Sequence, residues 1–251
     1  MPKQPAKAPK EGDASGGRPA RRASDRGRYG RLSRERVLAT ALDLVDREGL
    51  TALSMRRLGT ELGVEAMALY RYASSKDALL DGLVEALYSE LEDRLTAQAE
   101  TSAAEADAPT PRGELHRVAR ATYDVFQAHP EAVPLLTTRM LAVPLAQRPL
   151  PILRHHERVI GLLQESGLDT VRSAAALRAF TGWMLGYLSV ELQAMVDNPE
   201  ESDPGFRLGL HRMPPQELPR LRAAAPTLAE RGGPQGLSAG LDALLDIYTQ
   251  N

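Results

Sequence analysis

Residues 58–80 read LGTELGVEAMALYRYASSKDALL, and this stretch decides the fold. Two glycines, Gly59 and Gly63, precede a short apolar run that ends in the sequence YRY at 70–72. Where two helices are joined by a tight turn, a small residue must lie at their closest approach and a glycine must supply the left-handed turn. Gly59 and Gly63 fill these two positions, so the stretch predicts a helix-turn-helix.

Helix start signals extend this motif toward the N-terminus. Ser33 can cap a first helix that ends at Gly49, and Ser54 can cap a second helix that runs to Leu62. Each serine follows a leucine that is spaced to pack on the fourth residue of the new helix, as in a hydrophobic staple. Two capped helices therefore lead into the turn.

The same staple spacing recurs at Val64 and Leu69, which predicts that a third helix starts at Glu65 and contains AMALYRY, residues 66–72. Only one face of such a helix is buried against its neighbours, and the other face is free to enter a DNA major groove. The side chains expected to point outward are Ala66, Met67, Ala68, Tyr70 and Arg71. An ordinary αα-hairpin with an exposed tyrosine and arginine is the alternative reading.

The rest of the chain predicts an all-α protein, because apolar residues recur at helical spacing and no alternating strand pattern is present. We expect a disordered basic arm over 1–30, a three-helix domain with the helix-turn-helix over 31–77, and a helical domain over 78–251. A linker helix should cover about 75–96, and a mobile loop that is rich in Pro and Gly and contains short helical pieces should cover about 197–234. The basic arm is either a solvating tail or a segment that follows a phosphate backbone.

Composition excludes several classes of protein. The chain has 251 residues, no cysteine and a formal net charge of −2, so a disulfide framework and thiolate metal sites are excluded. No stretch is long and apolar enough to predict a membrane span, and the N-terminus lacks the pattern of a signal peptide. We expect a soluble, cytoplasmic protein without a membrane partner. No catalytic motif is recognisable, so we do not expect an enzyme.

Two groups of segments resemble a known family. LSRERVLATALDLVDREGLTALSMRRLGTELGVEAMALYRYASSKDALLDGL resembles the DNA-binding domain of the TetR (tetracycline repressor) family of bacterial transcriptional regulators, most diagnostically in LYRYASSKDALL. HPEAVPLLTTRML, FTGWMLGYLSVELQ and GLDALLDIY are similar to the ligand-binding and dimerisation domain of the tetracycline-repressor branch. The resemblance implies a DNA-binding domain followed by a helical domain that binds a small-molecule effector and forms the homodimer.

The resemblance also implies roles for single residues. Arg56 matches a base or phosphate contact, Lys76 a phosphate clamp, and Tyr70 and Tyr72 match phosphate and base-edge contacts. Arg71 is free to reach a guanine or a phosphate. Glu65 stands where members commonly have a capping Ser or Thr, and alanine and methionine replace polar base-reading residues. The expected DNA-binding set is Arg56, Glu65, Ala66, Met67, Ala68, Tyr70, Arg71, Tyr72 and Lys76.

The C-terminal half should supply a dimer interface and an effector pocket. The helices expected at about 171–196 and 236–248 carry apolar residues on more than one face, which favours packing against a second copy, although burial within one chain is the alternative. Aromatic and apolar residues at helical spacing mark a possible pocket, unless they form only core, and Glu191 is either a buried ligand-binding group or an exposed edge. The candidate pocket residues are Phe180, Trp183, Met184, Tyr187 and Glu191.

The histidines do not predict a metal site. His155 and His156 are adjacent, whereas two ligands on one helix face need a spacing of four. We expect them, with Glu157, at the surface or in a groove. PLLTTRM contains no histidine near Arg139, where the tetracycline repressors have one that helps to bind a metal–drug complex. No cofactor is expected, and the small-molecule effector stays unidentified.

The sequence therefore predicts a homodimeric, ligand-responsive regulator that binds a palindromic operator in double-stranded DNA, with repression as the expected mode. The alternative is an architectural or non-specific DNA-binding protein. That protein would bind through its basic arm with steep salt dependence and little sequence preference. The sequence alone leaves both readings open.

Overall fold

The described part of the chain is built of helices. The computed structural model describes residues 32–249 except 103–109, 141–142, 193–200, 208, 210–211 and 215. No strand occurs in these described ranges, which agrees with the all-α prediction. The arm expected over 1–30 lies outside them.

The first two helices begin and end where the capping signals predict. Helix α1 (Arg34–Glu48) begins after Ser33, and helix α2 (Met55–Leu62) begins after Ser54. The hydroxyl of each serine accepts a hydrogen bond from a backbone N–H in the first turn of its helix, at 3.2 Å and 3.1 Å. At the other end of α1, Gly49 leaves the helix with a φ of 80°.

The turn of the helix-turn-helix depends on two glycines. Gly63 has a φ of 66° and a ψ of 31°, the left-handed conformation that side chains disfavour. A Cβ placed on Gly59 would lie 2.8 Å from the carbonyl oxygen of Val64 and 3.2 Å from the backbone nitrogen of Ala66. The chain therefore returns so close to α2 that no side chain fits at Gly59, as the sequence predicts.

Helix α3 (Ala66–Leu69) is shorter than predicted, with four residues. The expectation that residues 66–72 are helical was wrong beyond Leu69. The backbone N–H groups of Tyr72 and Ala73 both donate to the carbonyl of Leu69, at 2.8 Å and 3.0 Å, and so close a turn instead of continuing the helix. This turn leads the chain to the start of the next helix.

Helix α4 (Lys76–Ser102) is 27 residues long and joins the helix-turn-helix to the following helices. The hydroxyl of Ser75 accepts a hydrogen bond from the N–H of Ala78 at 3.0 Å and caps its start. One face is fully buried, and it carries Leu79, Leu83, Leu87, Leu91 and Leu95. This face packs against α1 near its start and against α5 and α7 farther along.

Helix α4 extends beyond the predicted end near residue 96. Ala97, Gln98 and Glu100 are good helix formers, so the helix continues after its apolar pattern has ended. Helix α5 (Pro111–Ala128) likewise starts earlier than predicted, because Thr110 caps it and a proline is well tolerated at the first helical position. The expected linker over 97–113 is thus partly helical, and 103–109 lie outside the described residues.

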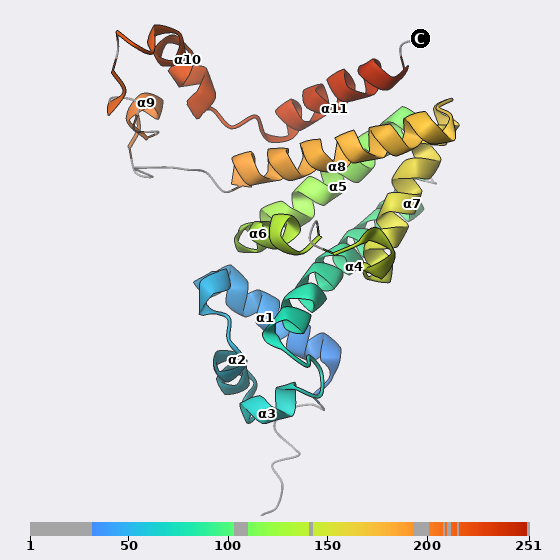
Figure 1. The fold of residues 1–251 in the computed structure, drawn as a ribbon, viewed down its shortest axis with the longest axis vertical. Coiled ribbons are helices and arrows are strands. Elements are labelled where there is room, and N and C mark those ends of the chain that lie inside the picture. Colours follow the sequence, from blue (N-terminus) through green and yellow to red (C-terminus); the bar gives the residue numbers. More distant parts are fainter. Residues whose placement is uncertain are drawn as a thin grey trace, which may run out of the picture. The chain divides into compact units, whose positions relative to one another are not determined.

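Four short 3-10 or π-helical turns and six further α-helices complete the described fold, and Figure 1 shows how these helices are arranged. Their bounds are η1 (Leu50–Ala52), η2 (Pro130–Ala132), α6 (Val133–Leu135), the π-helical turn η3 (Leu136–Met140), η4 (Leu145–Gln147), α7 (Leu150–Glu165), α8 (Thr170–Leu192), α9 (Pro204–Arg207), α10 (Pro219–Ala229) and α11 (Gly233–Thr249). Helix α8 packs against α5, α7 and α11, and α11 also packs against α5. No helix of the described ranges is long and apolar enough to cross a membrane.

The region expected over 197–234 as a loop with short helical pieces contains the four-residue α9 and the 11-residue α10. Pro226 lies inside α10, which explains why its sequence suggests a loop. The carbonyl that loses its partner there belongs to Arg222 on an exposed part of the helix, where water can satisfy it. Residues 197–200 of the expected loop lie outside the described residues.

Replacement of Gly59 by Ala tests the close approach of the turn to α2. We expect a loss of about 1–3 kcal/mol in the free energy of unfolding, because the new methyl group meets backbone atoms that cannot move aside. Gly161→Ala in α7 is the matched control, since nothing lies within 4 Å of a Cβ added there. It should leave stability unchanged or raise it by up to about 1 kcal/mol. Equal effects in urea denaturation would contradict the proposed contact.

Candidate nucleic-acid interface and effector cavity

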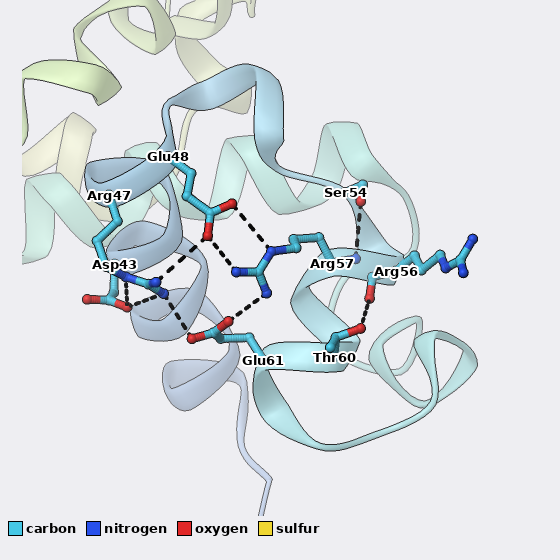
Figure 2. A network of polar contacts seen from close by, with 8 residues as sticks. All are labelled: Asp43, Arg47, Glu48, Ser54, Arg56, Arg57, Thr60 and Glu61. Atoms are coloured by element: carbon cyan, nitrogen blue, oxygen red, sulfur yellow. Dashed lines mark hydrogen bonds and ion pairs between the residues drawn. The ribbon is translucent and has the colours of Figure 1, made fainter.

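Two adjacent arginines at the start of α2 have different surroundings, as Figure 2 shows. Arg57 donates to Glu48 at the end of α1 and to Glu61 one turn along α2. The guanidinium of Arg56 points away from this network and forms no hydrogen bond or ion pair with the described residues. Arg57 therefore joins α1 to α2, and Arg56 is available to a partner outside the protein.

The network around Arg57 continues through Arg47, which pairs with Asp43 and Glu61, both at 2.9 Å. The hydrogen bond from Arg57, followed by the charges of both arginines, holds the pKa of Glu61 below its ordinary value. Single ion pairs at a surface contribute little to stability. Several that share partners fix the orientation of α1 relative to α2 more effectively than one alone.

The predicted DNA-contacting residues differ in exposure. Met67 is 74% exposed and Tyr70 44% exposed, whereas Ala66, Ala68 and Tyr72 are half-buried. Arg71 follows α3, and Lys76 is the first residue of α4. Both are exposed, and neither forms an ion pair or a side-chain hydrogen bond in the described ranges. Glu65 precedes α3 without a capping bond from its side chain.

A histidine that the sequence did not mark joins the helix-turn-helix segment to the helices beyond it. His129 lies after α5, with Nδ1 2.7 Å from Oδ2 of Asp46 in α1 and Nε2 3.1 Å from Oε2 of Glu90 in α4. The His129 ring therefore links the end of α5 to both α1 and α4.

Two further ion pairs link the start of α4 to its neighbours. Arg34 in α1 donates to Glu85 at 2.7 Å, and Arg139 in η3 pairs with Asp77 in the first turn of α4. Their partners lie 51 and 62 positions apart in the sequence, so local patterns could not have revealed them. A shift of η3 or α5 would act directly on α1 and α4.

A cavity lies among α4, α5, α7 and α8. Its polar lining consists of Tyr88, Thr122, His155, His156 and Thr181, and its apolar lining consists of three leucines with Phe180 and Met184. The space open to the centre of a water-sized sphere is ≈ 10 Å³, enough for about one water molecule. A larger molecule can enter only if the surrounding helices separate.

Both histidines of α7 are buried, which corrects the expectation that they lie at the surface or in a groove. His155 is 8% exposed and His156 is 7% exposed, while Glu157 is exposed as expected. The reason is that α7 packs against α4, α5 and α8, so adjacent positions on the helix are both covered. Burial, together with the nearby His156 and Arg158, lowers the pKa of His155 to about 3.

The five predicted pocket residues divide into two sets. Phe180 and Met184 line the cavity. Trp183, Tyr187 and Glu191 instead contact α11 or the residue just before it. The Trp183 ring lies 2.9 Å from the position of a Cβ on Gly240, and the Tyr187 hydroxyl donates to the carbonyl of Gly233. Burial, more than the charge of Glu191, raises the pKa of Tyr187 to about 12.

Glu191 is buried and caps the start of α11. Its carboxylate oxygens accept hydrogen bonds from the N–H groups of Gly232 at 2.9 Å and Gly233 at 3.1 Å. This capping role differs from both alternatives considered from the sequence, which were a ligand-binding group and an exposed edge. A signal was present in the sequence, since helix starts rich in glycine lack a capping side chain of their own.

A second cavity of ≈ 110 Å³ lies beside the start of α7 and has a charged lining. It includes Arg139, Arg148 and Asp81. Nη1 of Arg148 lies 3.5 Å from Nε2 of His156, so the two cavities are neighbours. In the described ranges, no group of three or more His, Asp or Glu residues is arranged to hold a metal ion.

The buried histidine predicts an acid-sensitive fold. Between about pH 6.5 and pH 3 the unfolded chain binds a proton at His155 that the folded chain excludes, so stability falls as pH falls, by about 1.4 kcal/mol per unit. When the pH falls from about 7 to about 5, the free energy of unfolding of His155→Leu should decrease by about 2 kcal/mol less than that of the parent protein. Urea denaturation at both pH values measures this, with His116→Gln, at a half-buried site, as the control. Equal losses in the parent and His155→Leu would contradict neutral burial.

Comparison with known proteins gives matches at both ends of the chain. Residues 37–83 match the family described as bacterial regulatory proteins, tetR family, and residues 106–246 match the family described as tetracyclin repressor-like, C-terminal domain. The HTH-type transcriptional repressor DrrR1 of Streptomyces coeruleorubidus is 31% identical over 165 residues, which cover 66% of this chain and 56% of that protein. An HTH-type transcriptional regulator of Saccharopolyspora erythraea is 32% identical over 64% of this chain and 61% of its own length.

The fold has solved counterparts. A possible TetR family transcriptional regulator from Streptomyces coelicolor A3(2) superposes with a TM-score of 0.68 at 26% identity, over 85% of this chain and 97% of that one. The helix-turn-helix, the helical domain that follows it and the two family matches agree. The chain therefore belongs to the TetR family of bacterial regulatory proteins.

Proposed function

We propose that this chain is a homodimeric, sequence-specific DNA-binding regulator, and specifically a repressor that leaves its operator when a small molecule fills the cavity between α4, α5, α7 and α8. The observation that carries the proposal is the exposed guanidinium of Arg56 at the start of α2, without a partner in the described ranges, beside an Arg57 that is fully engaged within the protein. Membership of the family and the named repressor among its relatives support this reading.

Cationic and aromatic groups follow Arg56 along the chain. Tyr70 and Arg71 are exposed just after α3, and Lys76 is exposed at the start of α4. The amides at a helix start favour negative charge, so a phosphate that pairs with Lys76 also meets the positive end of α4. Met67 presents an apolar side chain suited to a thymine methyl group. These residues form the proposed DNA surface.

The cavity is placed so that a ligand acts on the DNA-binding segment. Tyr88 lines it from α4, Thr122 from α5 and Leu136 from η3. Contacts of Glu90, Arg139 and His129, which follows α5, tie the same elements to α1 and to the first turn of α4. Since the closed cavity has room for about one water molecule, a bound effector must displace at least one of the elements that line it, which are these three together with α7 and α8. The effector then favours the arrangement of helices with the lower affinity for DNA.

The proposed dimer uses α8 and α11. Gly182, Gly186 and Val190 recur every four residues on one face of α8; the glycines are exposed with nothing within 4 Å of an added Cβ, and Val190 is 73% exposed. Small residues on one face let a second helix approach closely. Ile247 on α11 is also 73% exposed. A second copy packed here would form a four-helix interface.

Selection of bound sequences from a pool of random duplexes tests the function. A dimer should enrich a palindrome and bind it at least about a thousandfold more tightly than scrambled DNA. Equal, strongly salt-dependent affinity for all sequences would refute sequence-specific regulation and favour an architectural role.

Arg56→Ala should weaken binding to the selected operator by about 1–3 kcal/mol without lowering the midpoint of thermal unfolding. Arg57→Ala is the matched variant, because it removes an identical charge from the adjacent position. It should lower the midpoint of thermal unfolding, since Glu48 and Glu61 lose their partner. Fluorescence anisotropy measures operator binding by both variants, and thermal melts measure their stability. The assignment is contradicted if Arg57→Ala alone impairs binding while the protein stays fully folded.

Val190→Asp should convert the dimer to a monomer at micromolar concentration, because the interface would bury an unpaired carboxylate. Operator binding should fall with it, since one half-site supplies only part of the affinity. Leu145→Asp, at a position also exposed but in η4, is the control and should stay dimeric. Sedimentation velocity measures the oligomeric state of both variants. If Val190→Asp stays dimeric, the dimer interface lies elsewhere.

A further inference from the structure

The cavity beside His155 has a lining without formal charge. Among the described side chains that form it, none is Asp, Glu, Lys or Arg, and the polar groups are hydroxyls and two imidazole rings. Transfer of an unpaired charge into such a site costs far more than transfer of a hydroxyl or carbonyl group. The lining therefore favours an uncharged ligand.

The hydrogen-bonding capacity of the polar lining is mostly used within the protein. Nδ1 of His156 lies 2.7 Å from the carbonyl oxygen of Ile152 and must donate to it. The hydroxyl of Thr122 donates to the carbonyl of Val118 at 2.8 Å, so toward a ligand it can only accept. Each of these side chains has its donor committed before a ligand arrives.

The buried Nδ1 of His155 differs from these two groups. This atom has no hydrogen-bond partner in the described ranges. The ring packs edge-on against Tyr88, with 5.4 Å between ring centroids, and its side chain is more than nine-tenths buried. A buried polar atom without a partner costs about 1–3 kcal/mol, so it needs an explanation. A ligand that enters the cavity and forms a hydrogen bond with Nδ1 would explain both the unpaired atom and the cavity.

We propose that the effector is an uncharged aromatic molecule with a hydroxyl group that forms a hydrogen bond with Nδ1 of His155; this inference rests on the proposed function and names the chemistry of its effector. The neutral imidazole offers either a lone pair or an N–H at Nδ1, and a hydroxyl group is complementary to both forms. The rings of Tyr88 and Phe180, with the leucines and Met184, favour an aromatic body.

The neighbouring cavity provides the contrasting chemistry. Arg139 and Arg148 line it together with Asp81, and Arg148 has no carboxylate partner in the described ranges. A ligand with a carboxylate group would bind there instead, through the guanidinium groups. An acidic probe therefore separates the proposed effector class from its nearest competitor.

Three probes of similar shape test the inference: 2-naphthol, 2-methylnaphthalene and 2-naphthoate, bound to the full-length protein in equilibrium dialysis at neutral pH. The hydroxyl and methyl probes are nearly isosteric, so the ratio of their dissociation constants isolates the hydrogen bond. In His155→Leu the preference for naphthol over methylnaphthalene should fall about tenfold relative to the parent protein. His155→Asn keeps a polar atom near the position of Nδ1 and should retain part of the preference.

His116→Gln, outside the cavity, is the control and should leave the ratio unchanged. The inference is overturned if the ratio is the same in His155→Leu and the parent, if 2-naphthoate binds most tightly, or if none of the probes binds. Operator binding by the same variants is measured in parallel. An unchanged probe ratio in His155→Leu with operator binding intact refutes only the effector class, whereas failure to select any operator refutes the proposed function itself.

Discussion

The buried leucine face of α4 is the constraint on which the rest of the structure depends. Leu79, Leu83, Leu87, Leu91 and Leu95 are fully buried along one continuous helix. The first of them lie where α1 packs, and later ones where α5 and α7 pack. Because the same rigid helix carries Lys76 at its start and Tyr88 beside the cavity, the two ends of the proposed mechanism cannot move independently.

Polar and charged side chains divide into those that hold the fold and those left for partners. Arg57, His129 and Glu191 each satisfy at least two groups within the protein. Arg56 and Lys76 satisfy none through their side chains in the described ranges. The cavity follows the same division, because among the described side chains that line it only His155 has a fully buried polar atom, Nδ1, without a hydrogen-bond partner. Unpaired groups thus mark the proposed DNA surface and the proposed effector site.

Local chemistry explains which features could be predicted from the sequence. Ser33, Ser54 and Gly63 act on residues within a few positions of themselves, so the helix-turn-helix and its capped helices were correctly predicted. The end of α3 was not, because its last turn is set by the return of the chain to the cap of α4. The burial of His155 and the capping role of Glu191 were missed since both depend on helices distant in sequence, the latter 41 residues away. The resemblance to the family singled out Arg56, and only the geometry explains why its neighbour differs.

The coupling between cavity and DNA surface is the central claim, and it is tested most directly by the affinity of the protein for its selected operator at increasing occupancy of the cavity. Fluorescence anisotropy of a labelled operator, with 2-naphthol titrated to saturation, provides this measurement. Displacement of α4, α5 or η3 predicts a fall in operator affinity of about 5–150-fold. An unchanged affinity while dialysis shows the cavity filled would contradict the account, because a ligand without differential affinity for the two arrangements shifts no equilibrium.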